Sequence, residues 1–305
     1  MNQLSGDVKV AACGRGELHS VLQWLYRDLD DASRRVQVES SARGFGDDDV
    51  FVATRAGTLI GAIVSRLVPG RVGWLWPPHL DEGEFVCGND ARIAEQLVRC
   101  AIDRMARAGI RLVQTLLPTD ASSEALVTNG LRRIAEMIRM VRPAGPPPIV
   151  SDNSAALEFL PFAETLRRDF EEVVLHTYEQ SRDCPELDGL RSVSETLDGY
   201  LASGESPARL WYLAAEFGKY VGCLLVAEFP DEARCDLQYM GVVREARGRR
   251  LGMRIAARAI ELADECGADE LWLSVDSRNL PAIRHYQSLG FIEADRRVAY
   301  FRPVA

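Results

Sequence analysis

Residues 247–252, RGRRLG, combine arginines and glycines at a point where a strand-like segment gives way to a helix-like one. The preceding segment, CDLQYMGVV at 235–243, is apolar and aromatic, and apolar residues then recur every three or four positions through 251–266. A helix start carries backbone N–H groups without intrahelical partners, and the helix dipole adds partial positive charge there. Glycine lets the backbone approach an anion closely. The pattern therefore favours a phosphate site, with a nucleic-acid patch or a solvated basic turn as alternatives.

Bulk composition narrows these alternatives. The net charge is -9 and the pI about 5.1, the wrong sign for a protein that coats nucleic acid. The seven cysteines form no C-x-x-C pair and lie away from the four histidines, so neither a metal site nor a disulfide framework is expected. The sequence shows no bilayer-length apolar run and no secretory signal. We expect a cytoplasmic protein with no metal, no nucleic-acid partner and no membrane partner.

The chain repeats one pattern of hairpin, helix, strand, helix and final strands. Gly57 recurs as Gly218, 161 positions later, and the other landmarks recur at nearly the same offset. A constant offset across several glycines and prolines indicates a duplicated unit. The matching segments are 50–64 with 211–226, 93–109 with 251–267, 129–131 with 289–291, and 140–143 with 300–303.

A proline-rich stretch separates the two copies. Four prolines fall within residues 143–148, which excludes a helix or a central strand there. We expect domains at 1–143 and 155–305, joined by a linker at 144–154. Alternating strands and helices predict an α/β fold in each domain, a mixed and mostly antiparallel sheet flanked by helices that ends in a strand pair.

The second copy resembles the GNAT N-acetyltransferase superfamily. The family motif R/Q-x-x-G-x-G/A is matched by Arg247 and Gly252, whereas Arg250 stands where the middle glycine is usual. The segment 276–291 resembles the family's N-x-x-A-x-x-x-Y-x-x-x-G-F, through Asn279, Ala282, Tyr286, Gly290 and Phe291. The resemblance implies two tandem GNAT-like domains, an architecture similar to that of mycothiol synthase. Arg250 either adds a cation for phosphates or weakens the backbone approach.

The resemblance also implies acetyl-CoA as co-substrate, with no metal. The strand residues would bind the pantetheine arm, and the N–H of Val242 would donate to the thioester carbonyl and stabilise the oxyanion. The turn would hold the pyrophosphate. Asn279 is either a helix cap or a CoA contact. The expected cofactor-binding residues are Met240, Gly241, Val242, Val243, Arg247, Gly248, Arg249, Arg250, Leu251, Gly252, Met253 and Asn279.

Two residues are candidates for proton transfer. Tyr286, in the second motif, is expected to protonate the departing thiolate, since a tyrosine with a pKa near 10 is protonated at pH 7; packing is the alternative. Asp236 shares a strand face with Gln238 and is the candidate base, through water; a solvent-facing strand residue is the alternative. His176, Tyr178 and Glu179 either line the acceptor pocket or form a polar helix face.

The first copy lacks the phosphate-binding pattern. Where the second has EARGRRLG, the first has FVCGNDAR, preceded by Asp81, Glu82 and Glu84, and Leu126 stands in the place of Tyr286. Residues 1–143 are therefore expected to be a degenerate GNAT-like domain. The second copy is expected to transfer acetyl to a primary amine of a small molecule or peptide by direct attack. A non-catalytic acyl-CoA sensor or scaffold, or an enzyme like mycothiol synthase that acetylates a small molecule, remains the alternative.

Overall fold

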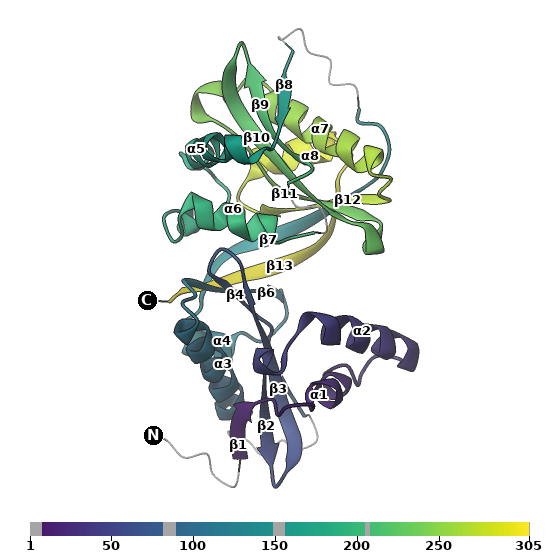
Figure 1. Ribbon diagram of the computed structural model, residues 1–305, viewed down its shortest axis with the longest axis vertical. Coiled ribbons are helices and arrows are strands. Elements are labelled where there is room, and N and C mark those ends of the chain that lie inside the picture. Colours follow the sequence, from purple (N-terminus) through teal and green to yellow (C-terminus); the bar gives the residue numbers. More distant parts are fainter. Residues whose placement is uncertain (1–7, 82–89, 149–155, 205–207, 305) are drawn as a thin grey trace. The chain divides into compact units, whose positions relative to one another are not determined.

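The computed structural model describes residues 8–81, 90–148, 156–204 and 208–304. The chain forms two compact units (Figure 1). Unit 1 comprises Met1–Arg133 and Ala299–Ala305, and unit 2 comprises Ile134–Val298. Among the described helices, none is both long and apolar enough to cross a membrane.

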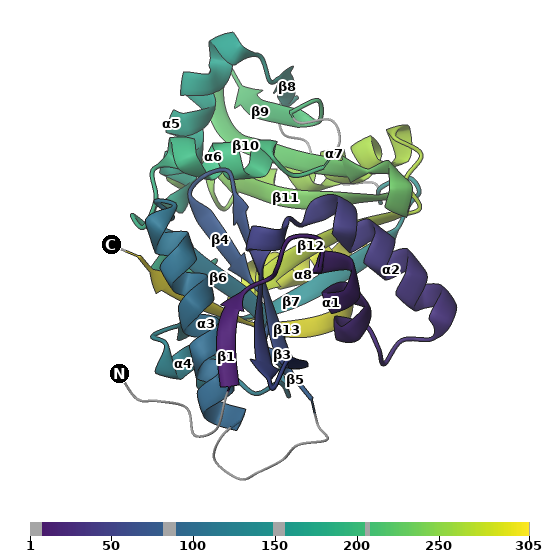
Figure 2. The same ribbon diagram turned by 60° about the horizontal axis from the view of Figure 1, so that its bottom comes forward.

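Unit 1 is a sheet with helices on both faces. Its strands follow the order β1-β2-β3-β4-β6, with the end of β13 beside β6, and β5 pairs separately with β3. Helix α3 packs on β2 and β3, whereas α1 covers the other face, which carries Val50, Val52 and Val64 (Figure 2). The elements are β1 (Val8–Ala12), α1 (Leu18–Leu25), α2 (Asp31–Gly44), β2 (Val50–Arg55), β3 (Thr58–Val68), β4 (Val72–Leu75), β5 (His79–Leu80), α3 (Asp90–Arg107), β6 (Leu112–Pro118) and α4 (Glu124–Thr128).

Unit 2 repeats this arrangement. Its strands follow the order β13-β7-β12-β11-β10-β9-β8, with α5 and α6 on one face and α7 and α8 on the other. The elements are β7 (Arg132–Pro143), β8 (Glu158–Pro161), α5 (Arg167–Tyr178), α6 (Val193–Leu201), β9 (Trp211–Glu216), β10 (Lys219–Phe229), β11 (Arg234–Val242), α7 (Leu251–Glu265), β12 (Glu270–Asp276), α8 (Leu280–Ser288) and β13 (Ile292–Pro303).

The strand directions confirm the predicted α/β class. The β4–β6 and β11–β12 pairs are parallel. The β1–β2, β2–β3, β3–β4, β8–β9, β9–β10, β10–β11 and β7–β12 pairs are antiparallel. The prediction of a strand pair at the end of each copy is wrong, because β7 and β13 are each one continuous strand of 12 residues.

The packing boundary differs from the boundary of the sequence repeat. Residues 134–143 belong to the first copy by sequence, yet they lie in unit 2, where β7 pairs with β12 from Met137 and Asp276 to Pro143 and Glu270. In return, the end of β13 lies in unit 1. Of the predicted linker, Ala144 donates its N–H to the carbonyl oxygen of Asp269 (2.7 Å), and residues 149–155 lie outside the described residues.

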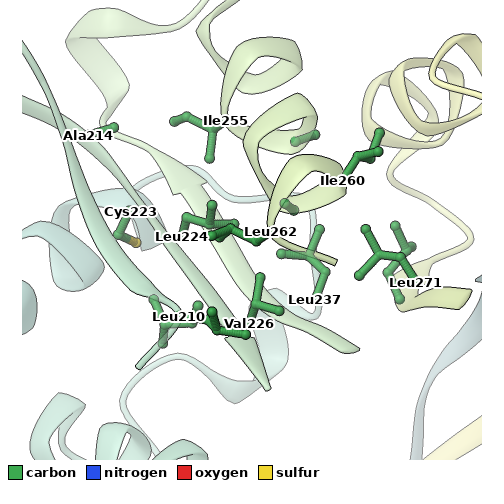
Figure 3. Packing of buried hydrophobic residues seen from close by; sticks show 14 of the residues in the cluster. Leu210, Ala214, Cys223, Leu224, Val226, Leu237, Ile255, Ile260, Leu262 and Leu271 are labelled. Carbon is green, nitrogen blue, oxygen red and sulfur yellow. The ribbon is translucent and has the colours of Figure 1, made fainter. Parts of the chain in front are cut away.

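Helix α7 anchors the core of unit 2. The apolar stripe was predicted at Leu251, Ile255, Ala259, Leu262 and Cys266. The first four residues are at most 1% exposed, whereas Cys266 is only partly buried. Figure 3 shows Leu262 beside Leu224 of β10. Burial of each such leucine or isoleucine contributes about 1.5–3 kcal/mol. The start of α7 is therefore fixed against the sheet, and the turn before it is held in place.

Candidate functional site

Strands β11 and β12 separate partway along their length. Their parallel register runs from Arg234 and Glu270 to Leu237 and Leu273 and ends there. A β-bulge marks the same point, because Leu225 pairs with Tyr239 and Val226 with Leu237, which leaves Gln238 as the extra residue. Beyond the bulge, β11 stays paired with β10 up to Val242. The edge of β11 that faces β12 is therefore open over its last residues.

The open edge presents backbone donors. Val243 donates its N–H to the carbonyl oxygen of Val221 on β10 (3.0 Å). Because successive residues of a strand point to opposite edges, the N–H groups of Val242 and Met240 face the open edge. This places two residues of the expected pantetheine-binding segment where an extended ligand can align with the strand.

The side chains around this segment belong to opposite faces. A Cβ added at Gly241 would lie 2.5 Å from Cβ of Thr177, so α5 lies directly on β11 at that residue. Met240 points to the other face, because its Cε would lie 3.8 Å from a Cβ added at Gly252 in α7. The expected strand and turn residues are thus brought together, and Gly241 is required by the close approach of α5.

The turn before α7 has the backbone that the motif requires. Gly248 has φ 80°, and Arg250 has φ 59° and ψ 12° as the residue that caps α7. Arginine thus adopts the left-handed conformation that glycine favours, at a cost of about 1–3 kcal/mol. Of the two alternatives for Arg250, this geometry favours an added cation, because the backbone path is kept.

The three arginines of the turn have different partners. Arg247 donates to the carbonyl oxygens of Val242 (3.1 Å), Thr177 (2.9 Å) and Glu179 (2.7 Å). Its guanidinium therefore joins the end of α5 to the end of β11. Arg249 pairs with Glu216. Arg250 is exposed, and its side chain contacts no hydrogen-bond or ion-pair partner among the described residues.

Glu216 is a buried carboxylate that sequence reasoning missed. Its side chain is 2% exposed, and one oxygen pairs with Arg249. The other oxygen, Oε1, contacts no hydrogen-bond partner in the described part of the chain. Glu216 ends β9, and its only sequence signal is its place before the Gly218 turn. The pair fixes Arg249 beside the hairpin between β9 and β10.

The α8 segment places Asn279 and Tyr286. The Asn279 side chain accepts from the N–H of Ala282 (3.4 Å), so it caps the helix. Tyr286 is 9% exposed and packs edge to face on Phe291. Its hydroxyl contacts no hydrogen-bond partner among the described residues. Burial, together with the negative charge of Asp183, raises the pKa of Tyr286 well above its ordinary value of 10.0.

Asp236 lies before the bulge, where β11 and β12 are still paired. It sits opposite Trp272 and forms an ion pair with Nε of Arg234 (3.2 Å). Burial raises the pKa of Asp236 above its ordinary value of 3.8. Gln238 follows at the bulge, and its Oε1 is buried without a hydrogen-bond partner among the described residues. The expected base is thus a partly buried carboxylate that already has a cationic neighbour.

A polar network missed by sequence reasoning joins the loop after α5 to the end of β12. Asp276, fully buried at the end of β12, accepts from the N–H of Cys184 (3.2 Å) and pairs with Arg278. Its own N–H donates to Asp183 (2.8 Å). Arg278 also pairs with Glu186. The loop after α5 is therefore tied to β12 and to the start of α8.

Of the three residues considered for the acceptor site, one packs against other side chains and two are exposed to solvent. Tyr178 packs edge to face on Tyr239, and burial raises its pKa to about 12. His176 and Glu179 are exposed. Tyr239 also contacts Thr177 by a hydroxyl hydrogen bond (2.6 Å) and stacks on Tyr200. Tyr178 thus belongs to a cluster of aromatic side chains with Tyr239 and Tyr200.

The remaining expectations concern metal and the first copy. In the part of the chain that the structure describes, no group of three or more His, Cys, Asp or Glu side chains is placed to hold a metal ion. Residues 82–89, which include most of the acidic replacement for the phosphate turn, lie outside the described residues.

Comparisons with known proteins find similar sequences over part of the chain. A model of the Acetyltransferase (GNAT) family matches residues 169–291. An uncharacterized N-acetyltransferase of Schizosaccharomyces pombe is 32% identical over 76 residues, 25% of this chain and 47% of that protein. The N-alpha-acetyltransferase MAK3 of Arabidopsis thaliana is 32% identical over 96 residues, 30% of this chain and 50% of that protein. The chain spans about half the length of these curated relatives.

Solved structures show the same fold over nearly the whole chain. A GCN5-related N-acetyltransferase from Sphaerobacter thermophilus has a TM-score of 0.63 at 19% identity, covering 99% of this chain and 97% of that one. A tandem GNAT protein from the clavulanic acid biosynthesis pathway has a TM-score of 0.55 at 15% identity, covering 98% and 99%. At these identities the likeness shows the fold, a tandem arrangement of two GNAT-like units.

Proposed function

We propose that this protein transfers an acetyl group from acetyl-CoA to a primary amine, because a model of the Acetyltransferase (GNAT) family matches residues 169–291. The second copy is the active one. One observation carries the proposal: β11 separates from β12 at a bulge and runs into a left-handed turn that begins α7. The open strand edge accommodates an extended thioester arm, and the turn accommodates its phosphates.

The reaction is a direct attack. The amine nitrogen bonds to the thioester carbonyl carbon, and the N–H of Val242 stabilises the oxyanion that forms. The carbon–sulfur bond then breaks, and the thiolate takes a proton from the hydroxyl of Tyr286. The amide nitrogen loses its extra proton, and this proton restores the hydroxyl of Tyr286 through water. Tyr286 is a buried residue whose hydroxyl contacts no hydrogen-bond partner among the described residues. Its raised pKa supports this role, since the proton is present at neutral pH.

The attacking amine must first lose its own proton. An alkylamine with a pKa near 10.4 is mostly charged at pH 7, a handicap of about 4.6 kcal/mol. Asp236, through water, is the proposed acceptor of that proton, because burial raises the pKa of its carboxyl and makes it a stronger base. An α-amine has a lower pKa and needs less help, so peptide N-termini and small α-amines are tested first.

The test measures free thiol released from acetyl-CoA with a panel of amines. We expect turnover with at least one amine, and a fall in kcat of about 10²-fold or more in Tyr286→Phe, which keeps the ring and removes the proton. Unchanged turnover in Tyr286→Phe would exclude the acid role. Binding of acetyl-CoA without thiol release from any amine would favour an acyl-CoA sensor instead.

A pH profile checks the same residue independently. Burial raises the pKa of Tyr286 above 10, so its proton is retained through the alkaline range. The neutral fraction of the amine meanwhile grows with pH. The wild-type rate should therefore rise from pH 7 to about pH 9 without an alkaline fall. A fall that begins below pH 9 and disappears in Tyr286→Phe would contradict the raised pKa.

A further inference from the structure

The hairpin between β9 and β10 carries an exposed aromatic side chain in an unfavourable backbone conformation. Phe217 is 80% exposed and has φ 51°, followed by Gly218 with φ 71°. Two successive left-handed residues form the type I′ turn of a tight hairpin. Asparagine or glycine fits the first position, whereas a bulky aromatic residue there is strained. The presence of phenylalanine at this position is therefore explained neither by burial of its ring nor by the backbone that the turn requires.

The first copy supplies an internal control for this turn. Its equivalent hairpin joins β2 to β3 through Ala56 with φ 48° and Gly57 with φ 82°. The backbone is the same, but alanine replaces the aromatic ring. Arg55 and Thr58 stand there in place of Glu216 and Lys219. The ring and its charged neighbours therefore occur on the copy that carries the phosphate turn, and the hairpin itself does not need them.

The hairpin is joined to the phosphate turn. Glu216, adjacent to Phe217, pairs through a buried carboxylate with Arg249. The antiparallel pairing of Gly222 with Val242 also brings the start of β10 beside the end of β11. Lys219, at the start of β10, is exposed, and its ammonium contacts no ion-pair partner among the described residues. An exposed aromatic ring and an exposed ammonium thus lie on a hairpin that is joined through Glu216 and Arg249 to the turn before α7.

We propose that this hairpin, residues 216–219, binds the nucleotide end of acetyl-CoA. The ring of Phe217 stacks on the adenine, and Lys219 pairs with the 3′-phosphate. Glu216 holds Arg249 beside the pyrophosphate. The inference rests on the proposed function, because it assigns the far end of the same ligand. Any nucleobase can stack on an aromatic side chain. The binding free energy of such stacking is large enough to explain why an exposed, strained phenylalanine is kept in this turn.

The test compares ligands that differ only at this end. CoA binding is measured by calorimetry, and turnover is measured with acetyl-CoA and with S-acetyl-pantetheine, which lacks the nucleotide. In Phe217→Ala we expect the CoA Kd and the acetyl-CoA KM to rise about 5- to 100-fold, with kcat unchanged. Turnover of S-acetyl-pantetheine should stay at the wild-type value.

Two further variants separate stacking from stability and from the phosphate. Phe217→Gly relieves the left-handed strain, so it should melt no lower than wild type while losing the same affinity. Lys219→Ala should remove any preference of the wild type for CoA over dephospho-CoA. Ala56→Phe, which places the ring on the same turn of the first copy, is the matched control and should leave CoA affinity unchanged.

The outcomes distinguish the two proposals. If wild type binds CoA and Phe217→Ala binds it equally well, the hairpin site is excluded while the acetyltransferase proposal stands. An equal loss with S-acetyl-pantetheine would also overturn the hairpin site, because the effect would not come from the nucleotide. If wild type binds no CoA and releases no thiol, the proposed function itself fails.

Discussion

At the scale of single residues, the turn before α7 shows that three arginines of one motif have different partners. Arg247 donates to four backbone carbonyl oxygens and holds α5 against the end of β11. Arg249 neutralises the buried Glu216. Arg250 keeps the backbone of a glycine and leaves its guanidinium exposed. Of the three, Arg250 is the one whose guanidinium contacts no hydrogen-bond or ion-pair partner among the described residues.

The role of Arg250 is tested by two replacements that accept its conformation. Both Arg250→Gly and Arg250→Asn fit a left-handed residue but remove the charge. We expect the melting temperature to hold or rise in both, and the CoA Kd to rise about tenfold, the equivalent of one charged hydrogen bond of about 1.5 kcal/mol. Affinity unchanged in both variants would assign Arg250 to the backbone alone.

At the scale of elements, the open edge of β11 depends on how closely α5 packs on it. Gly241 has no space for a side chain beneath Thr177, and Gly222 has none beneath the carbonyl oxygen of Gly241. The bulge at Gln238 turns β11 away from β12. Arg247 and the Asp276 network then fix the ends of the elements around the opening.

Gly241→Ala tests this close packing. An added Cβ would lie 2.5 Å from Cβ of Thr177, on a helix that cannot move without loss of packing. We expect the free energy of unfolding to fall by about 1–3 kcal/mol in denaturant titration. Gly252→Ala is the matched control, because its nearest contacts would be 3.8 and 3.9 Å away, and it should be neutral or stabilising. Equal stability of both variants would show that α5 can move away from β11 without loss of stability.

At the scale of the whole molecule, each unit contains a strand segment from the other sequence copy. Residues 134–143 complete unit 2, where Ile138 and Met140 are buried in its core. Arg142 donates to the carbonyl oxygen of Leu289 (2.9 Å) at the end of α8. In unit 1, Arg302 binds the carbonyl oxygen of Asn129 (2.7 Å) at the end of α4 in the same way. Arg142 and Arg302 occupy equivalent positions in the two copies of the sequence repeat.

Truncation tests this exchange. A fragment of residues 144–305 lacks β7 and leaves β12 without the partner of its seven paired residues. We expect it to show no cooperative unfolding and no CoA binding, whereas residues 134–305 retain both. Circular dichroism on heating and calorimetry with CoA provide the measurements. A fragment 144–305 that binds CoA like the whole chain would show that β7 is dispensable.

The sequence by itself determined the class of fold, the duplication and the turn before α7, because each is written in local patterns. The apolar stripe of α7, the glycine of each hairpin and the cap at Asn279 depend on residues a few positions apart. These were predicted and are present in the structure. The residue roles drawn from the family resemblance stay proposals, since they concern a ligand.

Only the tertiary structure decided which residues meet across long distances in the chain. The Glu216–Arg249 pair, the Asp183–Asp276 network and the carbonyl contacts of Arg247 join segments far apart in sequence. The exchange of β7 and β13 has the same origin, since strand partners are chosen by packing and hydrogen bonding of whole edges. The sequence repeat shows where the pattern of elements begins again. Strand pairing in the sheet determines to which unit each strand belongs.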